Sequence, residues 1–259
     1  MSELARRQLL TGMAISTVAG LPLAAILADS RLAHAAAAGL EDVSIVTAGG
    51  RTVKAALAVP TRTPAPAIVL VHEWWGLNDQ IKSVAAELAK KGYFGLAIDL
   101  YGGQVTDQPD RARALMQGVD ATAATDTAAS WVDWVRRREG VNGKIGTVGW
   151  CFGGGWSLNA SIAAPVDATV VYYGRVNQPV EQLKRLKGPV LGHFATRDQW
   201  INKKMVSGFE AAMTEAGKKL TAHWYEADHA FANPTSARYD EADAKLAWDR
   251  TLAFFKANL

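Results

Sequence analysis

Short apolar runs that alternate with helix-like patterns constrain the fold of this chain most. The runs are Ala67 to Val71, Tyr93 to Leu100, Ile145 to Trp150, Ala168 to Tyr173, Val190 to Phe194 and Thr221 to Glu226. Between and after them, amphipathic spacing predicts helices over Asp79 to Lys91, Ala121 to Arg138, Gly154 to Ala163, Val180 to Leu186, Lys203 to Ala216 and Ser236 to Asn258. Strands this apolar are buried on both faces, so we expect an α/β fold with a mainly parallel, doubly wound sheet and helices on both faces. The runs Val43 to Thr47 and Val53 to Val59 are expected to precede it as a hairpin that turns at Gly49-Gly50.

The only cysteine lies in the turn that follows the run Ile145 to Trp150. Gly149 and Gly153, on either side of Cys151, remove the side chains that would collide in a sharp reversal of the backbone. The sulfur would then be exposed at the tip of a strained strand-to-helix turn, which is where a nucleophile is placed on such a sheet. Backbone N–H groups that open the next helix, starting at Phe152, lower a thiol pKa and hold an oxyanion. A small buried core residue is the alternative interpretation of Cys151.

An acid and a histidine follow the cysteine in the chain order that this kind of turn requires. Asp198 comes just after one predicted strand, and His229 lies in the loop after the next. Because the carboxyl ends of parallel strands meet at one ligand-binding edge of the sheet, we expect both side chains to reach Cys151. His229 would accept the thiol proton or stabilise the thiolate, and Asp198 would fix the tautomer and orientation of the imidazole. The alternatives are that Asp198 caps a helix near Asn202 and that His229 is an ordinary polar loop residue.

Glu73 follows the run Ala67 to Val71 and is expected to point from a central strand end toward the cysteine. A carboxylate beside a thiol raises the free energy of forming the thiolate, so an unliganded site would stay unreactive. The alternative is a surface glutamate that caps the helix beginning near Asn78. His72-Glu73 also begins an H-E-x-x-H pattern, but no second histidine completes it, so we predict no metal site.

The chain resembles the dienelactone hydrolase (carboxymethylenebutenolidase) family of the α/β-hydrolase superfamily from about Glu41 to Leu259. The matching residues are His72-Glu73-Trp74-Trp75-Gly76-Leu77-Asn78, Asp99-Leu100-Tyr101-Gly102, Gly149-Trp150-Cys151-Phe152-Gly153-Gly154, Tyr172-Tyr173-Gly174, Asp198 and His229. The resemblance implies the α/β-hydrolase fold and hydrolysis of an enol-lactone or related ester through an acyl-cysteine intermediate, with no metal or organic cofactor. It also implies that Glu73 holds the thiol at rest and helps to deprotonate it when substrate arrives. By the same resemblance, the backbone N–H of Trp74 joins that of Phe152 in the oxyanion hole.

Substrate recognition departs from the family pattern. Dienelactone-active members hold a substrate carboxylate with two arginines, one in the segment after the Asp-Leu-Tyr-Gly strand end and one shortly after the catalytic histidine. Arg111 or Arg113 is the candidate for the first, and a solvated helix face is the alternative for both. Asn233 stands at the second position and brings no charge. We therefore expect an ester or lactone substrate, with Arg111, Asn233, Tyr173 and Trp200 as binding candidates, the two aromatic residues because they adjoin catalytic positions.

The N-terminal residues predict export. Arg6-Arg7-Gln8-Leu9-Leu10 precedes an alanine-rich apolar stretch from about Met13 to Ala28, and Ala33-His34-Ala35 supplies the small residues that a signal peptidase reads. We expect residues 1–35 to be a signal peptide for the twin-arginine export machinery, and residues 41–259 to form a single periplasmic or secreted domain. An uncleaved membrane anchor is the alternative, although the stretch is short for a span. With no second cysteine, the chain cannot form an internal disulfide.

The charge of the chain bears on one class of partner. The net charge is +3, without a basic run, so we expect no nucleic acid partner. We expect a monomer that acts on a small-molecule ester or lactone substrate and has no stable membrane span after cleavage. Two other functions stay open. One is a hydrolase fold that has lost catalysis and binds a small molecule; the other is a thiol redox protein, which the lack of a resolving cysteine disfavours.

Overall fold

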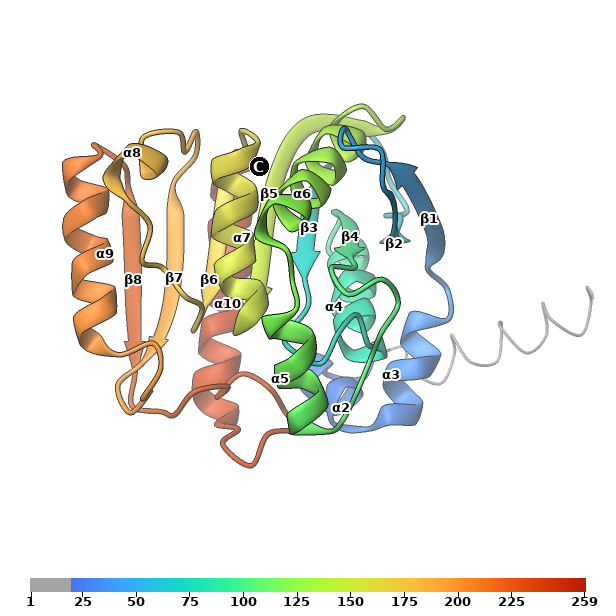
Figure 1. Cartoon of the computed structure of the whole chain (residues 1–259). Helices are drawn as coiled ribbons and strands as arrows, with labels where there is room; N and C mark the ends of the chain where they lie inside the picture. The colour runs from blue at the N-terminus through green and yellow to red at the C-terminus, as the bar shows by residue number, and fades with distance from the viewer. Residues whose placement is uncertain (1–19) are drawn as a thin grey trace, which may run out of the picture.

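One sheet of eight strands forms the centre of the part of the chain that the structure describes, residues 20–259 (Figure 1). In this computed structural model the strands lie in the order β1-β2-β4-β3-β5-β6-β7-β8. Their bounds are β1 Glu41–Val46, β2 Thr52–Ala58, β3 Ala65–Val71, β4 Phe94–Ile98, β5 Val141–Trp150, β6 Ala168–Tyr172, β7 Val190–Ala195 and β8 Leu220–Tyr225. The apolar runs of the sequence therefore correspond to strands, with shifts of a few residues at their ends.

Strand directions confirm the predicted sheet. β1 pairs with β2, and β2 with β4, in antiparallel orientation, whereas all remaining neighbours pair in parallel. Every residue of β4, β6 and β7 is buried, as expected for strands that helices cover on both sides. Because the parallel strands share one direction, their carboxyl ends meet at the lower edge of the sheet in Figure 1.

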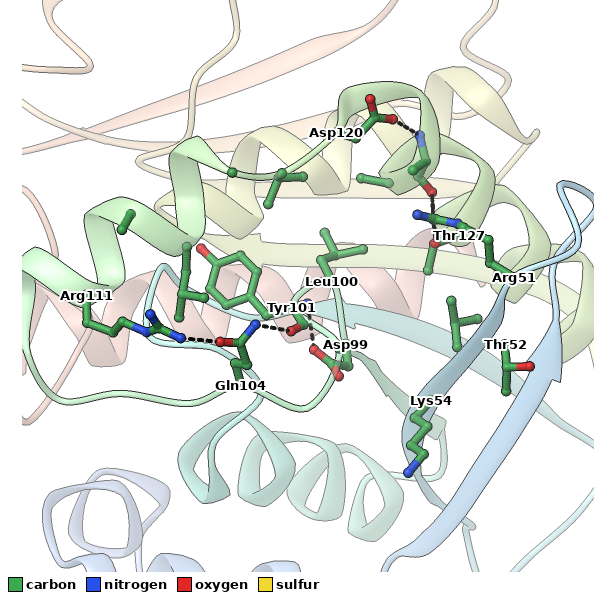
Figure 2. Close-up of a pocket in the computed structure, with 18 residues that line it drawn as sticks. Arg51, Thr52, Lys54, Asp99, Leu100, Tyr101, Gln104, Arg111, Asp120 and Thr127 are labelled. Carbon is green, nitrogen blue, oxygen red and sulfur yellow. Dashed lines mark hydrogen bonds between the residues drawn. The ribbon is translucent and has the colours of Figure 1, made fainter.

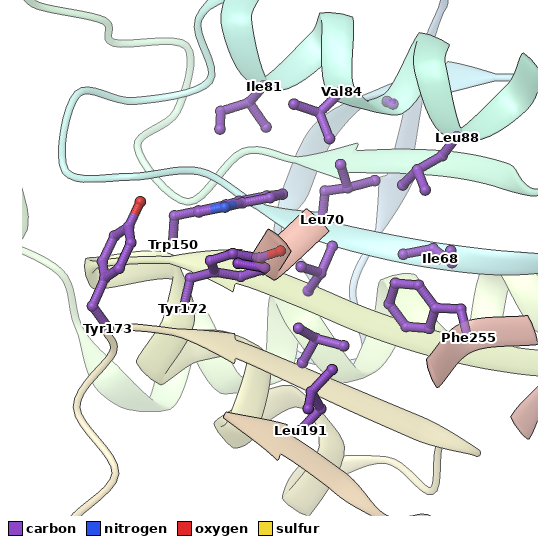
Figure 3. Close-up of a cluster of buried hydrophobic side chains, with 14 of the residues drawn as sticks. Ile68, Leu70, Ile81, Val84, Leu88, Trp150, Tyr172, Tyr173, Leu191 and Phe255 are labelled. Atoms are coloured by element: carbon purple, nitrogen blue, oxygen red, sulfur yellow. The ribbon is translucent and has the colours of Figure 1, made fainter. Parts of the chain in front are cut away.

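Helices cover the two faces of the sheet. Their bounds are α4 Asp79–Lys90, α5 Pro109–Gln117, α6 Ala121–Arg136, α7 Phe152–Ala163, α8 Val180–Leu183, α9 Lys203–Glu215 and α10 Glu241–Asn258. On one face, Leu88 of α4 and Phe255 of α10 pack against Ile68 and Leu70 of β3 (Figure 3). On the other face, α6 and α7 form a second buried cluster, and α7, α8 and α9 form a third. The arrangement is the α/β-hydrolase fold, with the core divided by the sheet.

Some predicted helix bounds are wrong for identifiable reasons. The last helix begins at Glu241 and not at Ser236, because the side chain of Asp240 accepts a hydrogen bond from the N–H of Asp243 and caps it. The helix predicted to end at Leu186 ends at Leu183. α5 was not predicted as an element; it has nine residues, with Pro109 in its first turn.

The N-terminal residues that the structure describes pack onto α4. Helices α2 (Leu23–Ala28) and α3 (Ser30–Ala37) lie against α4, and Ile26 and Ala33 are each 1% exposed. The carbonyl of Ala33 accepts a hydrogen bond from the hydroxyl of Ser83 at 2.9 Å. The predicted cleavage sequence thus lies in a packed helix, whereas the Arg6-Arg7 pair lies outside the described residues. No helix in residues 20–259 is both long and apolar enough to cross a membrane.

Candidate active site

Cys151 stands at the tip of the turn between β5 and α7, with φ 54° and ψ −117°. Few residues other than glycine adopt these backbone angles, and the strain in a residue that does so is about 1–3 kcal/mol. The two flanking glycines make it possible. A Cβ on Gly149 would lie 2.0 Å from the carbonyl oxygen of Gly153, and a Cβ on Gly153 would lie 2.2 Å from the carbonyl oxygen of Val71. The close approach of three backbone segments therefore fixes the half-buried thiol at the carboxyl edge of the sheet.

The structure brings Cys151, His229 and Asp198 into one hydrogen-bonded series. His229 Nε2 lies 3.1 Å from Cys151 Sγ, and His229 Nδ1 lies 2.6 Å from Asp198 Oδ2. Because a carboxylate only accepts hydrogen bonds, Nδ1 carries the proton and Nε2 is left to accept the proton of the thiol. The loops after β5, β7 and β8 supply one residue each, which is the convergence expected from the sequence.

Asp198 is held by its own backbone as well as by the histidine. Its Oδ1 accepts hydrogen bonds from the N–H groups of Trp200 at 2.8 Å and Ile201 at 2.9 Å. Burial alone would raise the pKa of Asp198, but the hydrogen bond from His229, the positive charge that this imidazole acquires when it accepts the thiol proton, and the two N–H groups lower the pKa below its usual value. The carboxylate therefore stays ionised and holds the imidazole ring in place.

The surroundings of Cys151 favour the protonated thiol. Burial raises the pKa of Cys151, and the nearby carboxyl groups of Glu73 and Asp198 raise it further. The N–H of Phe152 and the charge of Arg238 act in the opposite direction and do not outweigh burial. A thiol in this setting is unreactive until something changes the charge around it.

Glu73 lies at the end of β3, 7% exposed, with its side chain held by Asn233. Burial raises the pKa of Glu73 from 4.5 to about 7, while the hydrogen bond from Asn233 and, once its imidazole is protonated, the charge of His229 lower it in part. The group is thus poised between its neutral and ionised forms near neutral pH. A carboxyl group with such a pKa transfers a proton efficiently at that pH.

The amide of Asn233 is not free to bind a substrate carboxylate in this structure. Its Nδ2 donates to Glu73 Oε2 at 2.6 Å, and its Oδ1 accepts from the N–H and the hydroxyl of Thr235 at 2.9 and 2.8 Å. Asn233 therefore positions Glu73, a role that its place in the sequence did not suggest.

Arg111 lies away from the thiol. It donates a hydrogen bond to Gln104 and lines a cavity of about 630 Å³ with Arg51, Asp99 and Tyr101 (Figure 2). The residues that line this cavity include neither Cys151 nor His229. Arg113 is an exposed residue of the same helix, α5. The structure thus brings neither arginine to the thiol.

The two aromatic candidates both contact the catalytic histidine. The ring centroid of Tyr173 lies 5.1 Å from that of His229, and Tyr173 is fully buried with φ 34°. Trp200 is 59% exposed, and its ring meets His229 edge-on at 5.2 Å. The guanidinium of Arg238 lies 5.3 Å above the Trp200 ring. Arg238 was not identified from the sequence, because nothing in its local pattern distinguishes it from other surface cations.

The oxyanion-hole candidates lie on the two turns that flank the thiol. The N–H of Phe152 faces the sulfur closely enough to lower the pKa of Cys151. Trp74 directly follows Glu73 in the turn after β3, and its ring pairs with that of Trp75 at 4.7 Å. The hydrolase arrangement pairs one N–H from each of these turns.

His72 is a positioning residue that the sequence did not reveal as such. It is fully buried, with Nδ1 2.6 Å from the carbonyl oxygen of Glu73, and its Nε2 accepts a hydrogen bond from the N–H of Leu100 at 3.2 Å. It thereby joins the ends of β3 and β4 beneath the glutamate.

Within residues 20–259, no group of three or more His, Cys, Asp or Glu side chains is arranged to hold a metal ion.

Comparisons with known proteins agree with this architecture. The model of the dienelactone hydrolase family matches residues 53–259. A carboxymethylenebutenolidase of Pseudomonas putida is 30% identical over 229 residues, which cover 83% of this chain and 95% of that protein. Carboxymethylenebutenolidase 1 of Cupriavidus pinatubonensis is 27% identical over 222 residues, with coverage of 82% and 94%. Among solved structures, a dienelactone hydrolase-like promiscuous phosphotriesterase from metagenomic libraries shares the fold, with a TM-score of 0.78, 22% identity and coverage of 85% and 98%. The chain therefore belongs to the dienelactone hydrolase family and is an ester hydrolase of that type.

Proposed function

We propose that this protein hydrolyses lactones or other carboxylic esters through an acyl-cysteine intermediate, with Cys151 as nucleophile and His229 and Asp198 completing the triad. The observation that supports this most directly is the unbroken series from Sγ to Nε2 and from Nδ1 to the carboxylate, at 3.1 and 2.6 Å. Nucleophile, base and orienting acid within hydrogen-bond reach are the signature of nucleophilic catalysis.

The reaction has two halves. His229 accepts the thiol proton as Sγ attacks the ester carbonyl carbon, and the oxygen of the tetrahedral intermediate is stabilised by the N–H groups of Phe152 and Trp74. The intermediate collapses, the C–O bond breaks, and the leaving alkoxide takes the proton from His229. A water molecule then gives a proton to His229 and attacks the thioester, which releases the carboxylic acid and returns the proton to the sulfur. Ester and water thus yield acid and alcohol, with the enzyme unchanged.

Glu73 controls when the thiolate forms. In its ionised form the carboxylate opposes a second negative charge on Cys151, so the resting thiol stays protonated. A substrate that displaces Asn233 from Glu73 removes the hydrogen bond that lowers the glutamate pKa, and Glu73 then accepts a proton more readily. A neutral Glu73 no longer opposes a negative charge on Cys151, so the thiol then gives up its proton to His229 more readily.

Two variants test this assignment with activated aryl esters and unsubstituted lactones. Cys151→Ala is expected to abolish turnover and stoichiometric labelling by a thiol reagent, and His229→Ala is expected to lower kcat/KM by about 10²-fold or more through loss of the base. Both variants should keep the thermal unfolding of the wild type. Wild-type protein that turns over no activated ester would instead indicate a binding protein, and His229→Ala within about threefold of wild type would exclude the base.

We further propose that the precursor is exported by the twin-arginine machinery and that the enzyme acts as a monomer in the periplasm or outside the cell. The Arg6-Arg7 motif and the apolar stretch that follows it support export. The packing of α3 onto α4 bears on processing, because cleavage after Ala35 would remove α2 and most of α3. Mass spectrometry of protein recovered from each cell fraction tests both points, and intact protein found only in the cytoplasm would refute export.

A further inference from the structure

A second cavity, of about 610 Å³, lies on the α4 and α10 face of the sheet. Its walls come from α2, α4 and α10 and from the carboxyl ends of β5 and β6. The apolar side chains that line it are Leu23, Leu27, Ile81, Val84, Trp150, Tyr172, Trp248 and Leu252. Figure 3 shows Trp150, Tyr172 and Tyr173 side by side below Ile81 and Val84 of α4. The volume falls in the range of about 300–1,000 Å³ that small-molecule sites occupy.

The inner end of this cavity reaches the active site. Glu73, Tyr173 and Asn233 all line it. Tyr173 is fully buried with its ring against His229. The Glu73 carboxyl is close enough to raise the pKa of both Cys151 and Tyr173. Cys151 itself does not line the cavity, and the contact between them runs through Tyr173, whose ring lies 5.1 Å from that of His229.

The charges at the cavity favour an uncharged occupant. Its outer rim carries Glu87, Lys90, Lys91, Lys245 and Asp249. Lys90 and Lys91 contact Glu87 at 3.4 and 3.5 Å, and Lys245 contacts Asp249 at 2.7 Å. With Glu241, which also lines the cavity, the rim carries as many carboxylates as lysines. At the inner end, Glu73 would repel an anion. An apolar interior behind a rim of paired charges suits a neutral hydrocarbon group.

We infer that this cavity binds the apolar acyl or alkoxy group of the ester substrate, with the ester carbonyl beside Cys151. The inference rests on the proposed function and extends it by naming the substrate class, esters that carry a sizeable uncharged apolar group. Residues 20–27 form one wall of the cavity in the chain that keeps them, and cleavage after Ala35 would open the cavity on that side.

The experiment measures kcat/KM for p-nitrophenyl esters from acetate to octanoate, and for acetate esters of a matching series of alcohols. The protein is the whole chain, with its mass checked to establish that residues 20–37 are present. For wild type, kcat/KM is expected to rise about fourfold per methylene in one of the two series. This factor corresponds to the transfer free energy of a buried CH₂ group. The series that shows the gain identifies whether the acyl or the alkoxy group enters the cavity.

Cavity-filling variants make the test specific. Ala244 lines the cavity on α10, whereas Ala242 is an exposed residue of the same helix that does not. Ala244→Trp is expected to remove the gain with chain length while leaving acetate ester turnover unchanged, and Ala242→Trp is the matched control. Leu23→Trp repeats the test from the N-terminal wall if Ala244→Trp does not fold.

The outcomes separate the two proposals. The role of the cavity in substrate binding is supported if kcat/KM rises with chain length in wild type and in Ala242→Trp but not in the cavity-filling variants. Two outcomes would refute the role of the cavity and leave the proposed triad standing. In the first, acetate esters are turned over by the thiol but kcat/KM does not rise with chain length in either series. In the second, the rise persists in both Ala244→Trp and Leu23→Trp. Absence of Cys151-dependent turnover on every ester overturns the proposed function itself.

Discussion

Replacing Glu73 by Gln is expected to stabilise the protein, and more so at alkaline pH. Burial raises the pKa of Glu73 from 4.5 to about 7. The folded protein therefore keeps a proton on this group at pH values where the unfolded chain has released it. Between these two values the folded state binds more protons than the unfolded state, so the free energy of unfolding falls as pH rises. The stability is fully present below 4.5 and is lost as pH rises through about 7.

The size of the effect follows from the same two values. A change in pKa from 4.5 to about 7 corresponds to about 3 kcal/mol, at about 1.4 kcal/mol per factor of ten. Glutamine stays neutral and still offers an oxygen to the Asn233 amide, so Glu73→Gln does not lose stability as the pH rises. We expect the variant to gain about 2–3 kcal/mol over wild type between about pH 5 and about pH 8.

Urea unfolding at both pH values, followed by tryptophan fluorescence, measures this difference. Glu215→Gln, an exposed carboxylate at the end of α9, is the matched control and should follow the wild-type pH dependence. If Glu73→Gln raises the free energy of unfolding by the same amount at both pH values, the stabilisation comes from the packing of the glutamine side chain and not from the loss of an ionisable group. No gain at about pH 8 would contradict the buried, ionisable Glu73 on which the proposed resting state depends.

Two further predictions concern the thiol and its turn. Hydrogen peroxide is expected to inactivate Glu73→Gln faster than wild type at about pH 8, because the ionised glutamate opposes the thiolate that peroxide oxidises, and equal rates would refute this protection. Gly149→Ala is expected to lower stability by about 3 kcal/mol or more, because its Cβ would lie 2.0 Å from the Gly153 carbonyl oxygen. Gly208→Ala is the control, since a Cβ there meets nothing within 4 Å and the helix should gain up to about 1 kcal/mol. Thermal unfolding compares the two, and similar melting temperatures would refute the steric argument.

Much of the fold could be predicted from the sequence because its signals are local. Buried strands and amphipathic helices leave their periods in the chain, and a glycine on each side of Cys151 predicts a sharp turn without knowledge of its neighbours. Parallel strands then impose a common edge, so residues that follow strand ends must gather there. The predicted elements were wrong where the local signal was ambiguous. The short helix α5 was not predicted, and the start of α10 was misplaced because the cap at Asp240 decides it.

The sequence by itself therefore determined the α/β fold, the strained turn and the set of side chains at one edge of the sheet. Only the tertiary structure decided how those side chains are used. Asn233 holds Glu73, Arg111 lies at a different cavity, and α2 forms a wall of the cavity beside the active site. The pKa of Glu73 likewise depends on burial by segments far apart in the chain. Periodicity reports which face of an element is buried, whereas hydrogen bonding, desolvation and cavity shape depend on distances between elements, which no local pattern encodes.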